Sequence, residues 1–184
     1  MKAKGEAGLT LIEIVFAIAL MAIAMVGLVS VIIHTTRHNA VMRENMIAMR
    51  AAERQLEVLQ STTFDTIFTQ FGTAPANTFL VDGLVPVAAN ARVGAIWFPT
   101  ENVASRPPGT FQAPGGVQLL ETAARTLIGM DVDMNGNGSI DTTNILGQAS
   151  PWNTYGVLPV SIELNWRGIQ GTRQLVYRHV ILKK

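Results

Sequence analysis

The chain of 184 residues contains no cysteine and only three histidines. Without cysteine there is no thiol chemistry. If the chain is exported, its fold must be stabilised without disulfides, which makes a structural metal site worth seeking. The histidines form no cluster: His34 and His38 stand four residues apart beside a long apolar run, and His179 is alone near the carboxyl end. We therefore expect polar surface positions for them rather than a catalytic or metal-binding role.

An excess of charge of either sign is also missing. The chain has fourteen Lys and Arg residues and thirteen Asp and Glu residues, which gives a net charge of +1. The basic residues are scattered along the sequence. Such a chain has no basic field that would attract nucleic acid. Neither a glycine-rich phosphate loop nor a GxSxG motif occurs. The sequence therefore predicts neither an enzyme nor a nucleic-acid-binding protein.

What the chain does have is one long apolar run. Residues Ile14–Ile33 read IVFAIALMAIAMVGLVSVII, twenty residues without a charge. As a helix this run is about 30 Å long, which matches the hydrocarbon thickness of a bilayer. The alternatives are a secretory signal, whose apolar region is shorter at about 7–15 residues, or a core helix, which would be unusually apolar for so small a protein. We expect a transmembrane helix over about 14–33.

Helix-forming residues continue after this run. The segment Thr35–Gln60 contains neither Gly nor Pro. Apolar residues recur in it at spacings of three and four, which predicts one apolar stripe along a helix. The stripe consists of Met42, Met46, Met49, Ala52, Leu56 and Leu59. We expect a single helix over residues 9–60, whose stripe packs against a folded head or against neighbouring helices.

Glu13 stands directly before the apolar run, in the stretch GLTLIE. An acidic residue at the centre of a membrane helix costs about 3 kcal/mol on insertion scales, and unpaired charges are costly in any apolar setting. Close to a helix end the carboxylate can reach the membrane interface, which reduces that cost. One interpretation is therefore an interfacial carboxylate without a partner, and the residues around Glu13 suggest another.

MKAKGEAG, followed by LTLIE and about twenty apolar residues, resembles the amino terminus of type IV prepilins and of type II secretion pseudopilins. The resemblance covers roughly the first 60 residues. It implies that residues 1–8 are a leader, that a prepilin peptidase cuts after Gly8, and that Leu9 becomes an N-methylated amino terminus. It further implies that Glu13 meets the α-amine of a neighbouring pilin or pseudopilin subunit during filament assembly.

Two features bear on the kind of subunit. Leu9 stands where many family members have Phe, and the apolar run lacks the Pro that is common in major pilins. The stretches AIAMVGLVSV and RAAERQLEVLQS resemble minor pilins of the pilus modification type. This resemblance implies a single-pass inner-membrane protein with a periplasmic head that moves to the pilus on the cell surface after assembly. The alternatives are a minor pseudopilin of a type II secretion system and an anchored binding protein that never polymerises.

Residues 61–184 change in composition and predict a β-rich head. The clearest signal is a hairpin of two β-rich runs, Leu158–Trp166 and Thr172–Leu182, joined by a glycine-containing turn. Further expected elements are a run over Phe79–Val87 with a turn at Asp82-Gly83 and an edge strand at Pro86, a strand over Ala91–Phe98, and a helix or strand over Val117–Leu127. Together with the resemblance, these signals predict an α+β fold in which a long amino-terminal helix packs on an antiparallel sheet, as in type IV pilins.

The loop 131–144, DVDMNGNGSIDTTN, has oxygen ligands at alternate positions and glycines at the turn, as calcium loops do. A register starting at Asp131 and one starting at Asp133 are both open, and the second is preferred because it resembles the DxNGDGxxD loop of exported bacterial proteins. The alternative is an ordinary Asn- and Gly-rich turn. So few carboxylates imply weak, structural calcium binding. The candidate ligands are Asp131, Asp133, Asn135, Asn137, Ser139, Asp141 and Asn144.

Overall fold

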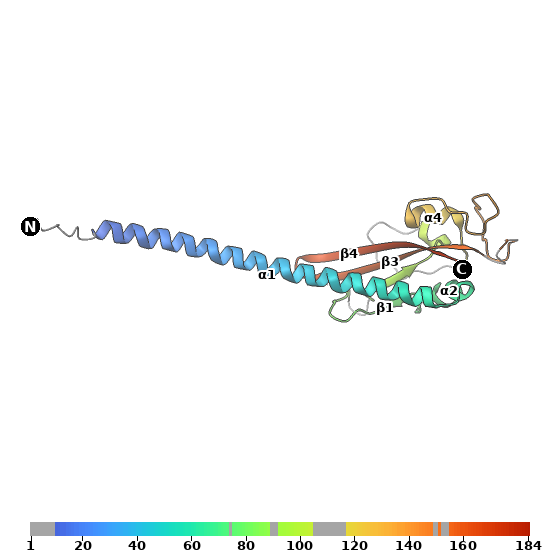
Figure 1. Cartoon of the computed structure of the whole chain (residues 1–184), viewed down its shortest axis with the longest axis horizontal. Coiled ribbons are helices and arrows are strands. Elements are labelled where there is room, and N and C mark those ends of the chain that lie inside the picture. The colour runs from blue at the N-terminus through green and yellow to red at the C-terminus, as the bar shows by residue number, and fades with distance from the viewer. Residues whose placement is uncertain (1–9, 74, 89–91, 105–116, 149–150, 152–154) are drawn as a thin grey trace, which may run out of the picture. The chain divides into compact units, whose positions relative to one another are not determined.

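The structure is a computed structural model that describes residues 10–73, 75–88, 92–104, 117–148, 151 and 155–184. Its contacts divide the chain into two compact units, Met1–Met42 and Arg43–Lys184. The first long element, helix α1, is Leu11–Ser61 and contributes to both units. Figure 1 shows the chain and labels several of its helices and strands.

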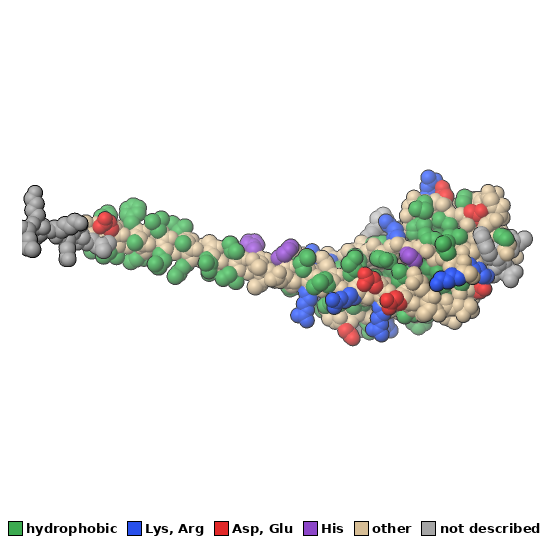
Figure 2. All heavy atoms as spheres, in the orientation of Figure 1, with side chains coloured by type: hydrophobic (Ala, Val, Ile, Leu, Met, Phe, Trp, Pro, Cys, Tyr) green, Lys and Arg blue, Asp and Glu red, His purple; other side chains and the backbone are tan. Residues whose placement is uncertain are grey.

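Within the first unit, α1 contains one stretch that is long and apolar enough to cross a membrane, with a mean hydropathy of 2.8 over its best window. No residue of that window is buried. Figure 2 shows this part of α1 covered by hydrophobic side chains, with an acidic side chain at its start. The helix runs without interruption through Gly27 and Ser30. At the end of the run, the hydroxyls of Thr35 and Thr36 donate to the carbonyls of Val31 and Ile32, at 2.9 and 3.0 Å.

The second unit is an α+β head built around a four-stranded antiparallel sheet in the order β1-β2-β3-β4. The strands are β1 Thr78–Phe79, β2 Gly94–Trp97, β3 Val157–Gly168 and β4 Gly171–Leu182. The short helices are η1 Phe64–Thr66, α2 Ile67–Phe71, α3 Glu101–Ala104 and α4 Glu121–Ile128. The predicted α+β layout, a long helix packed on an antiparallel sheet as in pilins, is confirmed.

The two faces of the sheet carry separate apolar clusters. On one face the carboxyl half of α1 contributes Ala48, Ala52, Leu56 and Leu59, which pack with Ile96, Ile162, Leu164 and Trp166 of the strands. On the other face Ala95 and Trp97 of β2 pack with Ala123 and Leu127 of α4. Alternate residues of a strand point to opposite faces, so neighbouring residues of β2 serve different clusters. A fully buried aliphatic side chain contributes about 1.5–3 kcal/mol, so these clusters hold α1 and α4 on the sheet.

The predicted apolar stripe of α1 is wrong in part. Ala52, Leu56 and Leu59 are buried, but Met42, Met46 and Met49 are 50%, 52% and 50% exposed. At about 100° per residue, Met49 lies about 65° and Met46 about 125° from the centre of the buried stripe, which Ala48 shares. Ala48, which the prediction omitted, is fully buried. A methyl side chain there lets the helix backbone approach the sheet closely.

The strand predictions were best where the pairing partner is adjacent in sequence. The hairpin is confirmed, and the strands extend to Gly168 and Gly171 around a two-residue turn. In the run Phe79–Val87 the predicted turn at Asp82-Gly83 is confirmed, with Gly83 at φ 86°. Strand β1 ends at Phe79, before this turn, and after it Pro86 pairs with Trp166 in an isolated bridge. The ambiguous Val117–Leu127 is helical from Glu121 onward.

Candidate functional site

Helix α1 begins with a capping box. Thr10 precedes the first helical residue, and its N–H and hydroxyl both donate to Glu13 Oε2, at 2.9 and 3.0 Å. In return the Glu13 N–H lies 3.4 Å from the Thr10 hydroxyl oxygen and 3.1 Å from its carbonyl oxygen. This reciprocal arrangement satisfies N–H groups that a helix start otherwise leaves unpaired. The sequence signal was Thr-x-x-Glu directly before an apolar run, which the analysis of Glu13 as a membrane carboxylate overlooked.

The capping box uses only one oxygen of the carboxylate. Both donors from Thr10 reach Oε2, and the described residues supply no hydrogen bond to Oε1. Glu13 therefore has a structural role within its own helix and keeps an acceptor for another group. The predicted cleavage and methylation positions, Gly8 and Leu9, lie outside the described residues.

The loop 131–144 is ordered by its own side chains. Asp133 Oδ1 accepts hydrogen bonds from the N–H groups of Gly136 and Asn137, at 2.6 and 3.2 Å, and its Oδ2 accepts one from Gly138, at 2.7 Å. The turn needs both glycines, because Gly136 and Gly138 have φ values of 71° and 88° that are strained for other residues. Asp133 thus closes the tight turn in which the candidate ligands stand.

Three candidate ligands meet in this turn. The amide groups of Asn135 and Asn137 both donate to Asp141 Oδ2, at 2.8 and 2.9 Å. The Oδ1 atom of each Asn accepts a hydrogen bond from the backbone N–H two residues later. Asn135 Oδ1 accepts from Asn137 at 3.0 Å, and Asn137 Oδ1 accepts from Ser139 at 2.8 Å. The described residues contain no group of three His, Cys, Asp or Glu side chains that would hold a metal. A cation here would therefore depend on amide oxygens as well as on the two aspartates.

Of the remaining candidate ligands, Ser139 takes part in the turn through its N–H, and Asp131 and Asn144 are engaged elsewhere. Asp131 forms an ion pair with Arg125 of α4 at 3.4 Å. Asn144 Oδ1 accepts hydrogen bonds from the N–H groups of Leu119 and Leu146, at 3.1 and 3.2 Å, and so ties the end of the loop to the segment before α4. The ion pair of Asp131 counts against the register that starts there, and the hydrogen bonds of Asn144 engage the twelfth position of the register that starts at Asp133.

The side chain that holds this loop to the head was not among the residues predicted from the sequence. Glu121, the first residue of α4, is fully buried. Its Oε1 accepts from the N–H groups of Met134 and Asn135, at 2.7 and 3.0 Å, and its Oε2 from that of Asp141, at 2.7 Å. A carboxylate also suits the amino end of a helix. Glu121 was hidden because it lies ten or more residues before the loop, and nothing in the spacing marks a buried acid.

The structure thus has a membrane-length helix whose first turn contains Glu13 in a capping box. Its head has a polar loop that the buried carboxylate of Glu121 anchors. Comparison with protein-family models, with curated proteins and with solved structures finds no match for this chain.

Proposed function

We propose that this chain is a structural subunit of a type IV pilus filament, of the minor pilin class, that is made as a prepilin and cleaved after Gly8. The apolar part of α1 would hold the subunit in the inner membrane before assembly and in the filament afterwards. The observation that carries the proposal is Glu13 in the first turn of α1, before twenty uncharged residues, in a helix whose carboxyl half supports a four-stranded sheet.

The capping box refines how Glu13 would act in assembly. With Oε2 held by Thr10, the carboxylate has a defined position at the start of the helix. Oε1 is the atom that would accept a hydrogen bond from the α-amine of a neighbouring subunit. In an apolar bundle, removing one member of such a pair costs about 3–5 kcal/mol. The pairing would therefore favour a docked subunit over one left alone in the membrane.

The first test is mass spectrometry of the amino-terminal peptide in filaments sheared from producing cells. A peptide that begins at methylated Leu9 in this fraction is the expected result. The same processed peptide found only in the cell envelope would instead assign the chain to the pseudopilins of a type II secretion system. An uncleaved Met1 terminus would overturn the prepilin proposal.

A pair of variants separates the capping role of Glu13 from its role in assembly. Glu13→Gln keeps an oxygen for Thr10, as the Gln form of the capping box does, but removes the charge that an α-amine requires. We expect processing at Gly8 to continue and incorporation into filaments to fall at least about tenfold, the equivalent of 1.4 kcal/mol. Thr10→Ser, which keeps the cap and the charge, is the matched control and should assemble normally. Normal assembly of Glu13→Gln would show that the charge has no partner.

We further propose that Asp133, Asn135, Asn137 and Asp141 bind one calcium ion, whose positive charge would add to the hydrogen bonds that already order the turn. Their oxygens are of the type that calcium prefers, and rotation of the two Asn amides would direct carbonyl oxygens toward Asp141. With affinity in the range of extracellular modules, about 10⁻⁴–10⁻³ M, 10 mM calcium would add about 1.4–2.7 kcal/mol to the free energy of unfolding.

Thermal unfolding with calcium and with a chelator tests this site. We expect Asp133→Asn to abolish the calcium-dependent rise in melting temperature, and Asn137→Asp to increase it by adding a carboxylate ligand. Asp131→Asn is the control, because Asp131 pairs with Arg125. Equal melting temperatures with calcium and chelator in the wild-type chain would leave the loop as a polar turn.

A further inference from the structure

Strand β4 forms one edge of the sheet. Two hydrogen bonds define which of its backbone groups face outward. Asn165 N–H donates to Val93 on the β2 side of β3, and Lys183 N–H donates to Gly156 in continuation of the β3–β4 ladder. Because backbone groups alternate in direction along a strand, the odd-numbered residues of β4 pair with β3, and the even-numbered ones point away from it. The outward residues are Thr172, Gln174, Val176, Arg178, Val180 and Leu182.

This edge is open over the length of β4. The described residues supply no hydrogen bond to the outward N–H and C=O groups of 172–182. The side chains at these positions are exposed as well, except for that of Val180, which is partly buried. Val176 is 37% and Leu182 62% exposed. Twelve strand residues span about 40 Å, which is long for an unprotected edge. An open edge of this length is a template for a further strand.

The charge of the edge limits what that strand can be. The segment 171–184, GTRQLVYRHVILKK, contains four Lys and Arg residues and one His but no Asp or Glu. Among the described residues, an acidic group neutralises one of them: Asp65 Oδ1 lies 2.6 Å from Lys183 Nζ. A second copy of this edge would bring like charges together, which is destabilising across strands. An acidic segment would be attracted.

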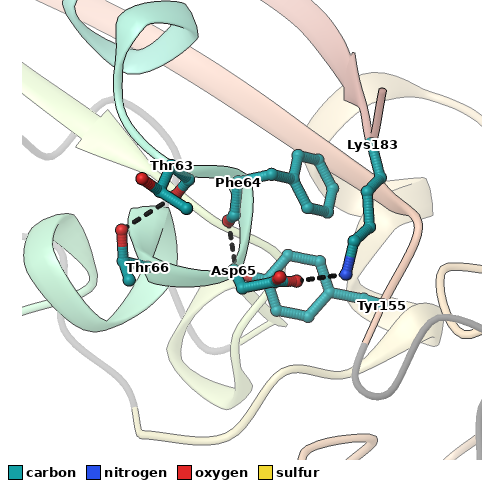
Figure 3. Close-up of polar contacts among 6 residues, drawn as sticks. All are labelled: Thr63, Phe64, Asp65, Thr66, Tyr155 and Lys183. Atoms are coloured by element: carbon teal, nitrogen blue, oxygen red, sulfur yellow. Dashed lines mark hydrogen bonds and ion pairs between the residues drawn. The ribbon is translucent and has the colours of Figure 1, made fainter.

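A cavity of about 740 Å³ lies at the carboxyl end of the same strand. The six consecutive residues 179–184 form one side of it, and Gln60, Phe64 and Ile67 contribute from the end of α1 and from η1 and α2. Figure 3 shows this corner, where the Phe64 ring lies beside Tyr155, with ring centroids 5.2 Å apart, and Lys183 reaches Asp65. The cavity thus has apolar and uncharged polar side chains in its lining, and its charged residues are Asp65, which pairs with Lys183, and Lys184.

We propose that the edge of β4 binds an extended, acidic segment of a partner protein, which adds as a fifth strand and places an apolar side chain in the adjacent cavity. Main-chain hydrogen bonds to the outward groups give this mode of binding its affinity, and side-chain pockets give it specificity. The basic residues of β4 select for acidic side chains and disfavour another copy of the same edge.

Amide hydrogen exchange of the full chain in detergent micelles tests the proposal. The probe is a capped twelve-residue peptide of alternating Glu and Val. In the free chain we expect the amides of Val176, Val180 and Leu182 to exchange at least about tenfold faster than those of Tyr177 and Ile181, which pair with β3. The Glu-Val peptide should slow the outward amides at least about tenfold and leave the inward ones unchanged.

Two control peptides separate strand addition from attraction by charge. A peptide with Lys in place of Glu should not bind. A Glu-Val peptide methylated on every backbone nitrogen keeps its charge but has no N–H to donate from either edge, and it too should not protect the outward amides. Equal binding of the methylated peptide would overturn strand addition. Outward amides that already exchange slowly in the free chain would also overturn the proposal, since the edge would then be covered.

A pair of charge variants tests the charge of the edge. Lys184→Glu should weaken binding of the Glu-Val peptide about threefold or more, within the range of exposed ion pairs. Arg50→Glu makes the same change on an exposed part of α1 and is the matched control. A Val176→Pro variant removes one outward N–H without removing a hydrogen bond to β3, at a position outside the cavity, and should reduce binding while Val176→Ala does not. Unchanged binding in both Lys184→Glu and Val176→Pro would show that the peptide binds elsewhere.

Discussion

Replacement of Glu121 tests the central packing argument of the head. Its carboxylate is fully buried and accepts three backbone N–H groups from the loop, at 2.7, 3.0 and 2.7 Å. Glu121→Ala removes all three acceptors at once. Glu121→Gln keeps one oxygen for Met134 and Asn135 but turns an NH₂ group toward the N–H of Asp141. The two variants therefore differ in how many donors lose their partner.

The size of each effect follows from burial. A buried N–H without an acceptor costs about 1–3 kcal/mol, and hydrogen bonds to charged groups contribute about 1.5–3 kcal/mol. Met134 and Asn135 are fully buried, whereas Asp141 is partly exposed, so water can replace its acceptor. We expect Glu121→Ala to lower the free energy of unfolding by about 2–5 kcal/mol, and Glu121→Gln by about 1.5–3 kcal/mol.

Chemical denaturation of the full chain in detergent measures these changes, and amide exchange of Met134 and Asn135 shows whether the loop opens first. The matched control is Glu101→Gln. Glu101 also accepts two backbone N–H groups, from Val117 and Gln118 at 3.1 Å each, but this site is exposed. Loss of the Glu101 carboxylate should lower the free energy of unfolding by less than about 1 kcal/mol. A Glu121→Ala variant within about 0.5 kcal/mol of the wild type would refute the argument, because surface changes are of that size.

Two further predictions concern the packing of the head. Burial of the Tyr155 side chain raises its pKa to about 12 from 10.0. A hydrogen bond with the Phe68 backbone opposes this rise in part, and the nearby negative charge of Asp65 adds to it. In the unfolded chain the phenol ionises at lower pH, so the free energy of unfolding falls by up to about 2.7 kcal/mol as the pH rises from about 10 to 12. Unfolding curves of Tyr155→Phe at alkaline pH should lack this loss. The same pH dependence in the wild type and in Tyr155→Phe would contradict the prediction. A methyl group at Gly94 would collide with the Phe79 ring of β1. Gly94→Ala should therefore lower the free energy of unfolding by about 1–3 kcal/mol in denaturant titrations, and an unchanged midpoint would show that the ring moves freely.

Local patterns carried the predictions that succeeded. The hairpin is confirmed because its two strands are neighbours in sequence, and a two-residue turn brings them into register without any distant partner. The long helix is confirmed because residues 11–61 contain only one Gly and no Pro. The capping box was equally local, and Thr10 with Glu13 would have predicted it.

Distant contacts explain the predictions that failed. Met46, Met49 and Ala52 recur at a spacing of three residues and so fit one apolar stripe by sequence. Only contact with the sheet decides which side of the helix is buried. β1 and β2 pair across a loop, so alternation alone overestimated the lengths of both strands.

The sequence by itself determined a membrane-length helix and a β-rich head, because helical length, hydropathy and strand alternation are properties of neighbouring residues. The tertiary structure alone decided that Glu121 is buried under the Asp- and Asn-rich loop, and that β4 lies at an open edge beside a cavity. Both depend on which segments meet across the sheet. Burial and strand order follow from the whole set of packing contacts, and no single stretch of sequence records them.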